Sequence, residues 1–448
     1  MAFGFFKKSQ KADLIIYNGV IRTVNPERPN VSAVACKDGR IIATGDIENM
    51  EELKGSDTLT VDLEGKYVLP GLIDIFSQPV IPVFKEKFLD LSGISDIDTL
   101  LKKLGDWALT HTEDELIFGF GYSEKAAELS DESEKTITEL LDSCCIDKPV
   151  ILLCQSSISC VLNSCAANIV KETAEEEMVE YVTVPYVLNL FVPFDFEEIE
   201  KAVEQQLSDN ISLGITATFN TGAADYFESL YQDSLISLYN EDILHQRFFG
   251  SYMINRPLIP AAVVHKLMMR KTMCNEINGM INADTLYIYL NQSVNPIEFS
   301  SDALISIVSE AADKGFSIYI TAAEDKDIDI AGAALEYIRS KGYKNIFVIQ
   351  SSSTLDSSEM IHAESAYYLP PREDFFNMDI TEFIETVTVT AADIVRASDS
   401  IGSIEKDKCA DFAIFDKDPL AMTPEDFWHC PAQITVFNGK LFNITPEV

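Results

Sequence analysis

Short apolar runs separated by tight turns mark both ends of the chain. They occupy residues 12–24, 32–45, 58–68, 409–419 and 432–444. Two-residue hairpins favour Asn-Gly and Asp-Gly because both central residues need positive φ, and such dipeptides stand at 18–19, 38–39 and 438–439. The pattern predicts that both ends contribute strands to one small β-sandwich domain.

Between these ends, strand-like runs alternate with helical ones. The strand-like runs are short and apolar, and they cover 115–121, 149–154, 183–191, 214–219, 247–253, 285–290, 316–321 and 345–350. Apolar residues recur at helical spacing in three intervening segments, 196–207, 301–314 and 329–341. Ser301 and Asp302 are placed to cap the second helix. Alternation of this kind predicts a parallel sheet, and about eight units predict a closed (β/α)8 TIM-like barrel.

The predicted protein is therefore of the α/β class, with two domains and a short tail. The tail covers 1–11, the composite β-sandwich domain combines 12–69 with 400–448, and the barrel covers 70–399. The barrel is expected to carry the functional site, because this fold places its sites at the carboxyl ends of its strands.

The amino-acid composition argues against two classes of binding partner. The 448 residues include 34 basic and 72 acidic ones, which gives a formal charge of -38. A surface this acidic repels phosphate backbones and anionic lipids, so neither nucleic acid nor a membrane is expected as a partner. The nine cysteines are odd in number and scattered, which favours free thiols in a reducing cytoplasm.

Several segments resemble one family phrase by phrase. Residues 66–80 read KYVLPGLIDIFSQPV, residues 34–46 read VACKDGRIIATGD, and residues 387–420 contain TAADIVRASDSIGSIEKDKCADFAIFDKDP. Together with 12–29 and 147–170, these segments resemble amidohydrolase family 3, a branch of the amidohydrolase superfamily that includes N-substituted formamide deformylases. The resemblance implies a TIM-like barrel, an ancestral hydrolase acting on carbon-nitrogen bonds other than peptide bonds, and a zinc or other divalent metal at the strand ends.

The resemblance also shows which residues stand where the family carries its first metal ligands. The two histidines of the opening His-x-His correspond to Phe76 and Gln78, with Ser77 between them. The bridging lysine corresponds to Tyr287. A phenol cannot be carbamylated, so that bridge cannot form.

The remaining positions are replaced as well. The family's two later imidazoles correspond to Thr321 and Ser351, and its general-base carboxylate corresponds to Ala366. The histidine that helps to hold substrate corresponds to Ile158. Hydroxyls and amides hold zinc weakly compared with imidazole and thiolate, so no metal cofactor is expected.

Two further interpretations concern what the replaced pocket holds. His362 and Glu364 share a face if they lie on a strand, and they are weak alternative metal candidates near the lost carboxylate. The replacements make the pocket neutral with aromatic walls, which suits a small neutral or aromatic ligand. The other interpretation is that these side chains fill a redundant cavity and stabilise the barrel.

The sequence therefore predicts an amidohydrolase-like protein that has lost its metal centre and catalysis and retains small-molecule binding or a regulatory role. Two alternatives stay open. The first is an active hydrolase of carbon-nitrogen bonds with a relocated site. The second is a non-catalytic partner subunit of an intact paralogue. A homodimer, or a dimer with a paralogue, is the expected assembly.

Overall fold

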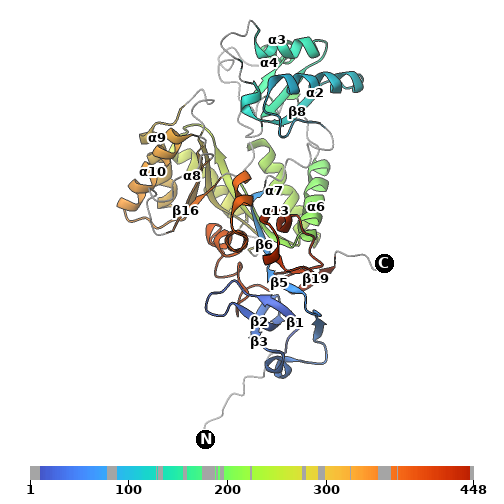
Figure 1. The fold of residues 1–448 in the computed structure, drawn as a ribbon. Helices are drawn as coiled ribbons and strands as arrows, with labels where there is room; N and C mark the ends of the chain where they lie inside the picture. Colours follow the sequence, from blue (N-terminus) through green and yellow to red (C-terminus); the bar gives the residue numbers. More distant parts are fainter. Residues whose placement is uncertain are drawn as a thin grey trace.

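Three β-sheets follow one another along the molecule (Figure 1). The computed structural model describes residues 11–77, 88–127, 129, 135–154, 159–173, 187, 190–191, 196–221, 225–274, 279–290, 298–322, 324–351, 365–370 and 372–443. One sheet joins the two ends of the chain, the second is the large parallel sheet in the middle, and the third stands at the opposite end.

The first sheet has eight strands, and both ends of the chain contribute to it. Its order is β19-β18-β17-β5-β1-β2-β3, and β4 pairs with β1. The bounds are β1 (Leu14–Arg22), β2 (Asn30–Lys37), β3 (Arg40–Gly45), β4 (Leu59–Asp62), β5 (Tyr67–Pro70), β17 (Phe412–Phe415), β18 (Ile434–Phe437) and β19 (Lys440–Asn443). The antiparallel pairing of β5 with β17 connects residues more than 300 positions apart, which only the tertiary fold could bring together.

Two of the three predicted hairpin turns form. Asp38-Gly39 joins β2 to β3 and Asn438-Gly439 joins β18 to β19, with positive φ at all four residues. The third prediction is wrong, because Asn18-Gly19 lies inside β1 and there shifts its register against β2. A Cβ at Gly19 would lie 2.6 Å from Leu63 Cδ1, so this glycine serves a close packing contact instead of a turn.

The second sheet has seven strands, all paired in parallel, and it curls as in amidohydrolase barrels. Its order is β16-β15-β14-β13-β12-β11-β6. The predicted closed barrel of eight strands is not confirmed, because β16 and β6 stand at the two ends of the described order. The strand bounds are β6 (Leu72–Ser77), β11 (Ile215–Asn220), β12 (Arg247–Ile254), β13 (Ile281–Leu290), β14 (Ser317–Ala322), β15 (Phe347–Ser351) and β16 (Ala366–Leu369). The helices between them are α6 (Phe196–Ser212), α7 (Asp225–Asn240), α8 (Pro260–Cys274), α9 (Ser301–Asp313) and α10 (Asp325–Ser340). The cap of α9 is Ser300, whose hydroxyl accepts from Ala303 N at 3.2 Å, one residue earlier than predicted.

The third sheet departs from the prediction. The runs at 115–121 and 149–154 do form strands, but they pair with each other in a separate sheet of order β10-β9-β8-β7. Its elements are β7 (Leu89–Asp90), β8 (Ile117–Tyr122), β9 (Val150–Cys154), β10 (Cys160–Leu162), α2 (Ile97–Thr110), α3 (Ile137–Cys144) and α4 (Ser164–Thr173). Burial on both faces made these runs resemble barrel strands, and an apolar pattern does not specify which strand is the neighbour.

One predicted strand is helical where it is described. Of the run 183–191, the structure describes Val187, Leu190 and Phe191, and all three are in helical conformation. An apolar run of this length fits either a strand or a buried helix, and periodicity alone does not separate the two.

A short helical stretch returns the chain from the parallel sheet to the first sheet. It consists of α11 (Ile380–Glu385), a π-helical turn (Thr386–Thr390) and α12 (Ala391–Ile394), and α13 (Pro424–Trp428) follows β17. Short 3-10 helices cover Ile47–Leu53, Glu124–Ala127, Arg372–Asn377 and Pro419–Ala421.

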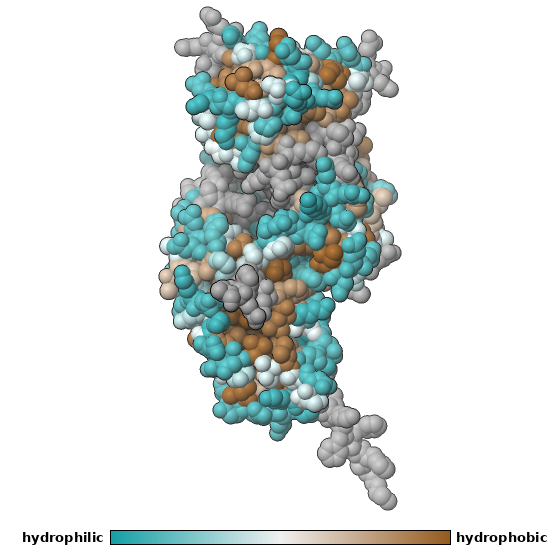
Figure 2. Space-filling model, turned by 90° about the vertical axis from the view of Figure 1, so that its right-hand side faces the viewer, coloured by the Kyte–Doolittle hydropathy of each residue, from teal (hydrophilic) through white to brown (hydrophobic). Residues whose placement is uncertain are grey.

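Figure 2 shows one face of the molecule, on which hydrophilic and apolar residues alternate at the upper end and apolar residues gather below the middle. Among the described helices, none is long and apolar enough to cross a membrane.

Candidate functional site

Strand alternation sorts the side chains of β13, β14 and β15 onto two faces. Tyr287, Tyr319 and Val348 belong to the core cluster inside the curled sheet, together with Phe219 and Ile73. Leu286, Ile318 and Ile349 belong instead to the cluster under helices α8 to α10. Successive strand residues point to opposite faces, so Thr321 and Gln350 share the inner face with Tyr319 and Val348.

Four inner side chains form a continuous hydrogen-bonded group, which we call the barrel polar cluster: Tyr287, Tyr319, Thr321 and Gln350. Thr321 Oγ1 donates to Gln350 Oε1 at 3.1 Å, and Tyr319 Oη donates to the same oxygen at 3.2 Å. Tyr287 Oη lies 2.9 Å from Thr321 Oγ1. A threonine hydroxyl has one proton, which Thr321 gives to Gln350, so Tyr287 is the donor to Thr321.

The rings of the cluster pack against each other and against the core. The ring centroids of Tyr287 and Tyr319 are 5.4 Å apart, and Tyr319 stacks on Phe219 with centroids 5.5 Å apart. Both distances lie in the range of favourable aromatic pairs. The three rings therefore pack against one another beside the hydrogen bonds.

Burial keeps the cluster uncharged. It raises the pKa of Tyr287 to about 12. Burial, followed by the neighbouring Tyr287, raises the pKa of Tyr319 well above its usual value. Both phenols are therefore protonated at neutral pH, and threonine and glutamine side chains carry no charge.

Thr321 and Tyr287 are the two predicted site residues that the structure brings together. Ser77 lies apart from them at the end of β6, where it is buried and accepts a hydrogen bond from Gln206 Nε2 of α6 at 3.1 Å. Ser351 is buried at the end of β15, and alternation puts it on the outer face with Ile349.

Ala366 lies at the other edge of the sheet. It opens β16 and pairs with Phe347 at the beginning of β15, whereas Leu369 pairs with Gln350. The carboxyl end of β16 is therefore Leu369-Pro370, and Gln350 Nε2 donates to Pro370 O at 3.4 Å. Ala366 does not contact the barrel polar cluster because three residues of strand separate it from that end.

The remaining predicted positions cannot be assigned contacts. Phe76 is in β6, and its side chain lies outside the described part of the structure. Gln78, Ile158, His362 and Glu364 lie outside the described residues altogether.

Sequence reasoning missed Tyr319 and Gln350, which complete the cluster. The signal was available in principle, because Tyr319 precedes Thr321 by two residues and Gln350 follows Val348 by two. The alignment with family motifs drew attention to Ser351 instead of the neighbouring Gln350.

The donor chemistry of the cluster is that of neutral hydroxyl and amide groups. Zinc in proteins is held by imidazole, thiolate and carboxylate, none of which the four cluster residues possess. Within the described ranges, no group of three or more His, Cys, Asp or Glu side chains is arranged to hold a metal ion.

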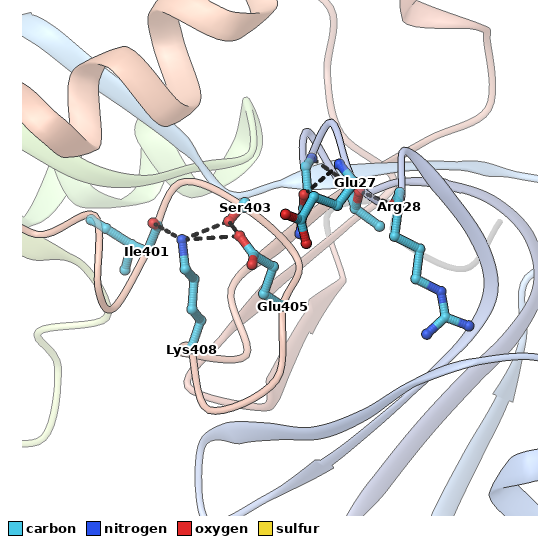
Figure 3. Close-up of polar contacts among 8 residues, drawn as sticks. Glu27, Arg28, Ile401, Ser403, Glu405 and Lys408 are labelled. Atoms are coloured by element: carbon cyan, nitrogen blue, oxygen red, sulfur yellow. Dashed lines mark hydrogen bonds and ion pairs between the residues drawn. The ribbon is translucent and has the colours of Figure 1, made fainter.

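In the loop between α12 and β17, a serine lies within hydrogen-bond distance of a lysine, which is a possible base. Figure 3 shows Lys408 pointing toward Ile401, Ser403 and Glu405, and Lys408 Nζ donates to Ser403 Oγ at 2.6 Å. Ser403 in turn donates to Glu405, which forms an ion pair with Lys408 at 3.3 Å. Burial acts against it, but the hydrogen bond from Ser403 and the charge of Lys408 lower the pKa of Glu405. Lys408 therefore contacts groups of its own loop, and the Ser403 hydroxyl donates its proton to the carboxylate of Glu405.

Solved structures of similar fold are metal-dependent hydrolases. An uncharacterized metal-dependent hydrolase from Pyrococcus horikoshii aligns with a TM-score of 0.63 and 18% identity over 93% of this chain and 99% of that one. Atrazine chlorohydrolase TrzN from Arthrobacter aurescens, complexed with zinc, aligns with a TM-score of 0.55 and 11% identity over 96% and 94%. At these identities the likeness establishes the fold.

Curated relatives match over shorter segments. The exoenzymes regulatory protein AepA of Pectobacterium carotovorum is 25% identical over 171 residues, which is 38% of this chain and 37% of that protein. The N-substituted formamide deformylase of Arthrobacter pascens is 25% identical over 164 residues, 36% of this chain and 30% of that enzyme. Protein LONG AFTER FAR-RED 3 of Arabidopsis thaliana is 32% identical over 112 residues, 25% of this chain and 19% of that protein. The matched segments thus span well under half the length of these relatives.

The family comparison covers most of the chain. The model of the amidohydrolase family matches residues 59–371 and 349–442, which include the parallel sheet and the return to the first sheet. This confirms the resemblance found in the sequence motifs. The chain belongs to the amidohydrolase family.

Proposed function

We propose that this chain is an amidohydrolase-family protein whose barrel no longer binds a metal or hydrolyses carbon-nitrogen bonds, and that it acts through binding or regulation. The barrel polar cluster is the observation that carries the proposal. Tyr287 and Thr321, which stand at the family's lysine and histidine positions, donate to a neighbour in a chain that ends on Gln350.

The electrostatics of the cluster support this proposal. A tyrosine binds a metal most strongly as the phenolate, and burial raises the pKa of Tyr287 to about 12. Its proton is used in the hydrogen bond to Thr321. Tyr287 and Thr321 therefore do not fit the zinc centre of the family.

The packing of the cluster supports a filled interior. Tyr287, Tyr319 and Phe219 contact one another through their rings, and Tyr319 and Phe219 are fully buried. Close-packed interiors leave little space for a ligand among such rings. In this proposal the aromatic replacements stabilise the former active-site end of the barrel, and small-molecule binding takes place elsewhere.

Metal analysis of the purified protein tests the first half of the proposal. The protein would be expressed in medium supplemented with zinc, iron and manganese, purified without chelators and measured by inductively coupled plasma mass spectrometry. We expect far less than one metal ion per chain, and the same for the His362→Ala/Glu364→Gln variant. A stoichiometric metal in the wild type that this variant loses would overturn the proposal in favour of a relocated site.

Turnover assays test the second half. N-substituted formamides, amides and cyclic ureas would be incubated at high protein concentration, with an intact family enzyme as the positive control. We expect no product above a protein-free blank. Turnover that a chelator abolishes and added zinc restores would show that the chain is an active hydrolase.

A further inference from the structure

A cleft lies between the first sheet and the amino end of the parallel sheet, away from the barrel polar cluster. Its volume is about 730 Å³, within the range of small-molecule sites. Distant segments line it: the start of β1, the β2–β3 hairpin, the beginnings of β12 and β13, the residues after α12, and the β18–β19 hairpin. The amino end of a barrel is the face that the family's chemistry does not use.

The lining has an unusual charge for this protein. Five basic side chains and two acidic ones line the cleft, whereas the chain as a whole has 34 basic and 72 acidic residues. The basic residues are Lys37, Arg40, Arg247, Arg396 and Lys440, and the acidic residues are Asp13 and Asp38. Cations gathered in a cleft of an acidic protein focus a local positive potential.

Three of these cations lack a close carboxylate partner. Arg40 donates to Asp407 O at 2.7 Å and Arg396 donates to Gly315 O at 2.6 Å, and both partners are backbone carbonyls. Neither arginine forms an ion pair with another residue that the structure describes. Lys440 lies 3.9 Å from Asp242 in a pair that is exposed on both sides, which contributes little.

Lys37 balances one of the two acidic charges of the lining. Asp13 accepts from Lys37 Nζ and, at 2.8 Å, from the backbone amide of Asp38. Asp38 itself is exposed and lies 3.8 Å from the same lysine. Arg40, Arg396 and Lys440 therefore outnumber the single lining carboxylate that Lys37 does not balance, and the cleft keeps a net positive charge.

The floor of the cleft is rigid and partly apolar. Arg247 is buried, pairs with Asp411, donates to Asn438 and lies 4.7 Å from the ring centroid of Phe437. Phe249, Met280 and Ile401 add apolar surface. Lys408 is close in sequence but points into its own loop, so it adds no charge to the cleft (Figure 3).

We propose that this cleft binds a small organic polyanion, a molecule with two or more carboxylate or phosphate groups. Its acidic groups would contact Arg40, Arg396 and Lys440, and its carbon skeleton would lie against Met280 and Ile401. Guanidinium groups suit carboxylate and phosphate alike, because they present parallel donors to two oxygens. The site is independent of the proposed loss of catalysis, because it is built from other residues at the other end of the strands.

Isothermal titration calorimetry with citrate and with inorganic pyrophosphate tests this proposal, at an ionic strength held constant with sodium chloride. We expect saturable binding of at least one of them, and the tighter one identifies carboxylate or phosphate as the preferred group. Arg40→Gln and Arg396→Gln should each weaken binding about tenfold, the effect of losing one charge-assisted contact. Lys103→Gln is the matched control, because Lys103 is an exposed cation on α2 that also donates to a backbone carbonyl.

Two results would overturn the proposal. The first is the absence of saturable binding of either anion to the wild-type protein. The second is binding that Arg40→Gln and Arg396→Gln leave unchanged, or that Lys103→Gln weakens equally, since this would indicate general attraction to charge. Circular dichroism of each variant shows whether it is folded before its binding is compared.

Discussion

The hydroxyl of Tyr287 donates to the hydroxyl of Thr321 across 2.9 Å, joining strands β13 and β14 inside the curled sheet. The sequence resemblance predicts that these positions correspond to a lysine and a histidine of the family motifs. Here they carry two neutral groups that satisfy each other, and Gln350 accepts the next proton in the chain. The relationship makes the interior testable by single substitutions.

Tyr287→Phe should destabilise the protein modestly. The substitution removes the donor to Thr321 while leaving the ring in place, so we expect the free energy of unfolding to fall by about 1–2 kcal/mol. Urea unfolding followed by circular dichroism measures the change. Tyr337→Phe is the control, because Tyr337 is an exposed tyrosine on α10 and should change stability far less. A Tyr287→Phe protein as stable as the wild type would contradict the hydrogen-bonded interior.

Alkaline pH should weaken the fold through the same residue. The pKa of Tyr287 is raised from 10.0 to about 12 in the folded protein, so the folded state holds the proton more tightly than the unfolded state. The corresponding stability is present below pH 10 and is lost as the pH rises toward 12. Two pKa units correspond to about 3 kcal/mol. Unfolding free energies measured from pH 9 to 12 should fall less steeply for Tyr287→Phe than for the wild type, and identical slopes would refute this assignment.

Breaking the buried Arg247–Asp411 pair should be costly. Asp411 is fully buried, its pKa is raised by burial, and its carboxylate is the partner of Arg247. Asp411→Asn leaves a buried guanidinium without a counter-charge, so we expect a loss of about 3–5 kcal/mol in unfolding free energy. Thermal or urea unfolding measures it.

The control for this pair is Asp418→Asn. Asp418 pairs with Arg22 at 2.7 Å, and both side chains are partly exposed. Removing a pair of that kind costs about 1 kcal/mol or less. Equal losses in the two variants would show that burial does not determine the strength of the Arg247–Asp411 pair.

Gly71→Ala should destabilise the protein although it adds a single methyl group. A Cβ at Gly71 would lie 2.1 Å from Thr216 Oγ1 on β11, which requires the two strands to move apart. We expect a loss of about 1–3 kcal/mol, the usual cost of overpacking. In contrast, Gly105→Ala in α2 meets no atom within 4 Å and should stabilise the helix by about 0.5–1 kcal/mol. A neutral Gly71→Ala would mean that β6 and β11 are less closely packed than the structure shows.

The Gly71 contact also explains why a family motif survives without its histidines. Pro70-Gly71 stands at the entry to β6, and Gly71 N donates to Asp411 O at 2.9 Å while its Cα approaches Thr216. These contacts hold the two sheets together and require no metal. Pro70 and Gly71 therefore have a packing role that is independent of any metal.

Much of the architecture followed from local sequence. The apolar runs of β11 to β15 and the spacing of α6, α9 and α10 predicted these elements closely, because burial on defined faces dictates residue type locally. The resemblance to family motifs then predicted a barrel-like sheet, and it pointed to Tyr287 and Thr321 as site residues. Neither source predicted that β8 and β9 form their own sheet, because strand partners are chosen by contacts that no local pattern encodes.

Some residues of the candidate sites could likewise be predicted from the sequence, and others could be found only in the structure. The sequence by itself determined that the chain resembles the amidohydrolase motifs, and from that resemblance came the prediction that Phe76, Gln78, Tyr287 and Thr321 stand at the ligand positions. Only the tertiary structure decided that Tyr319 and Gln350 complete the hydrogen-bonded interior, and that Arg40, Arg396 and Lys440 surround one cleft. The physical reason is that hydrogen bonds and electrostatic potential depend on distance in space, and residues hundreds of positions apart become neighbours only when the sheets form.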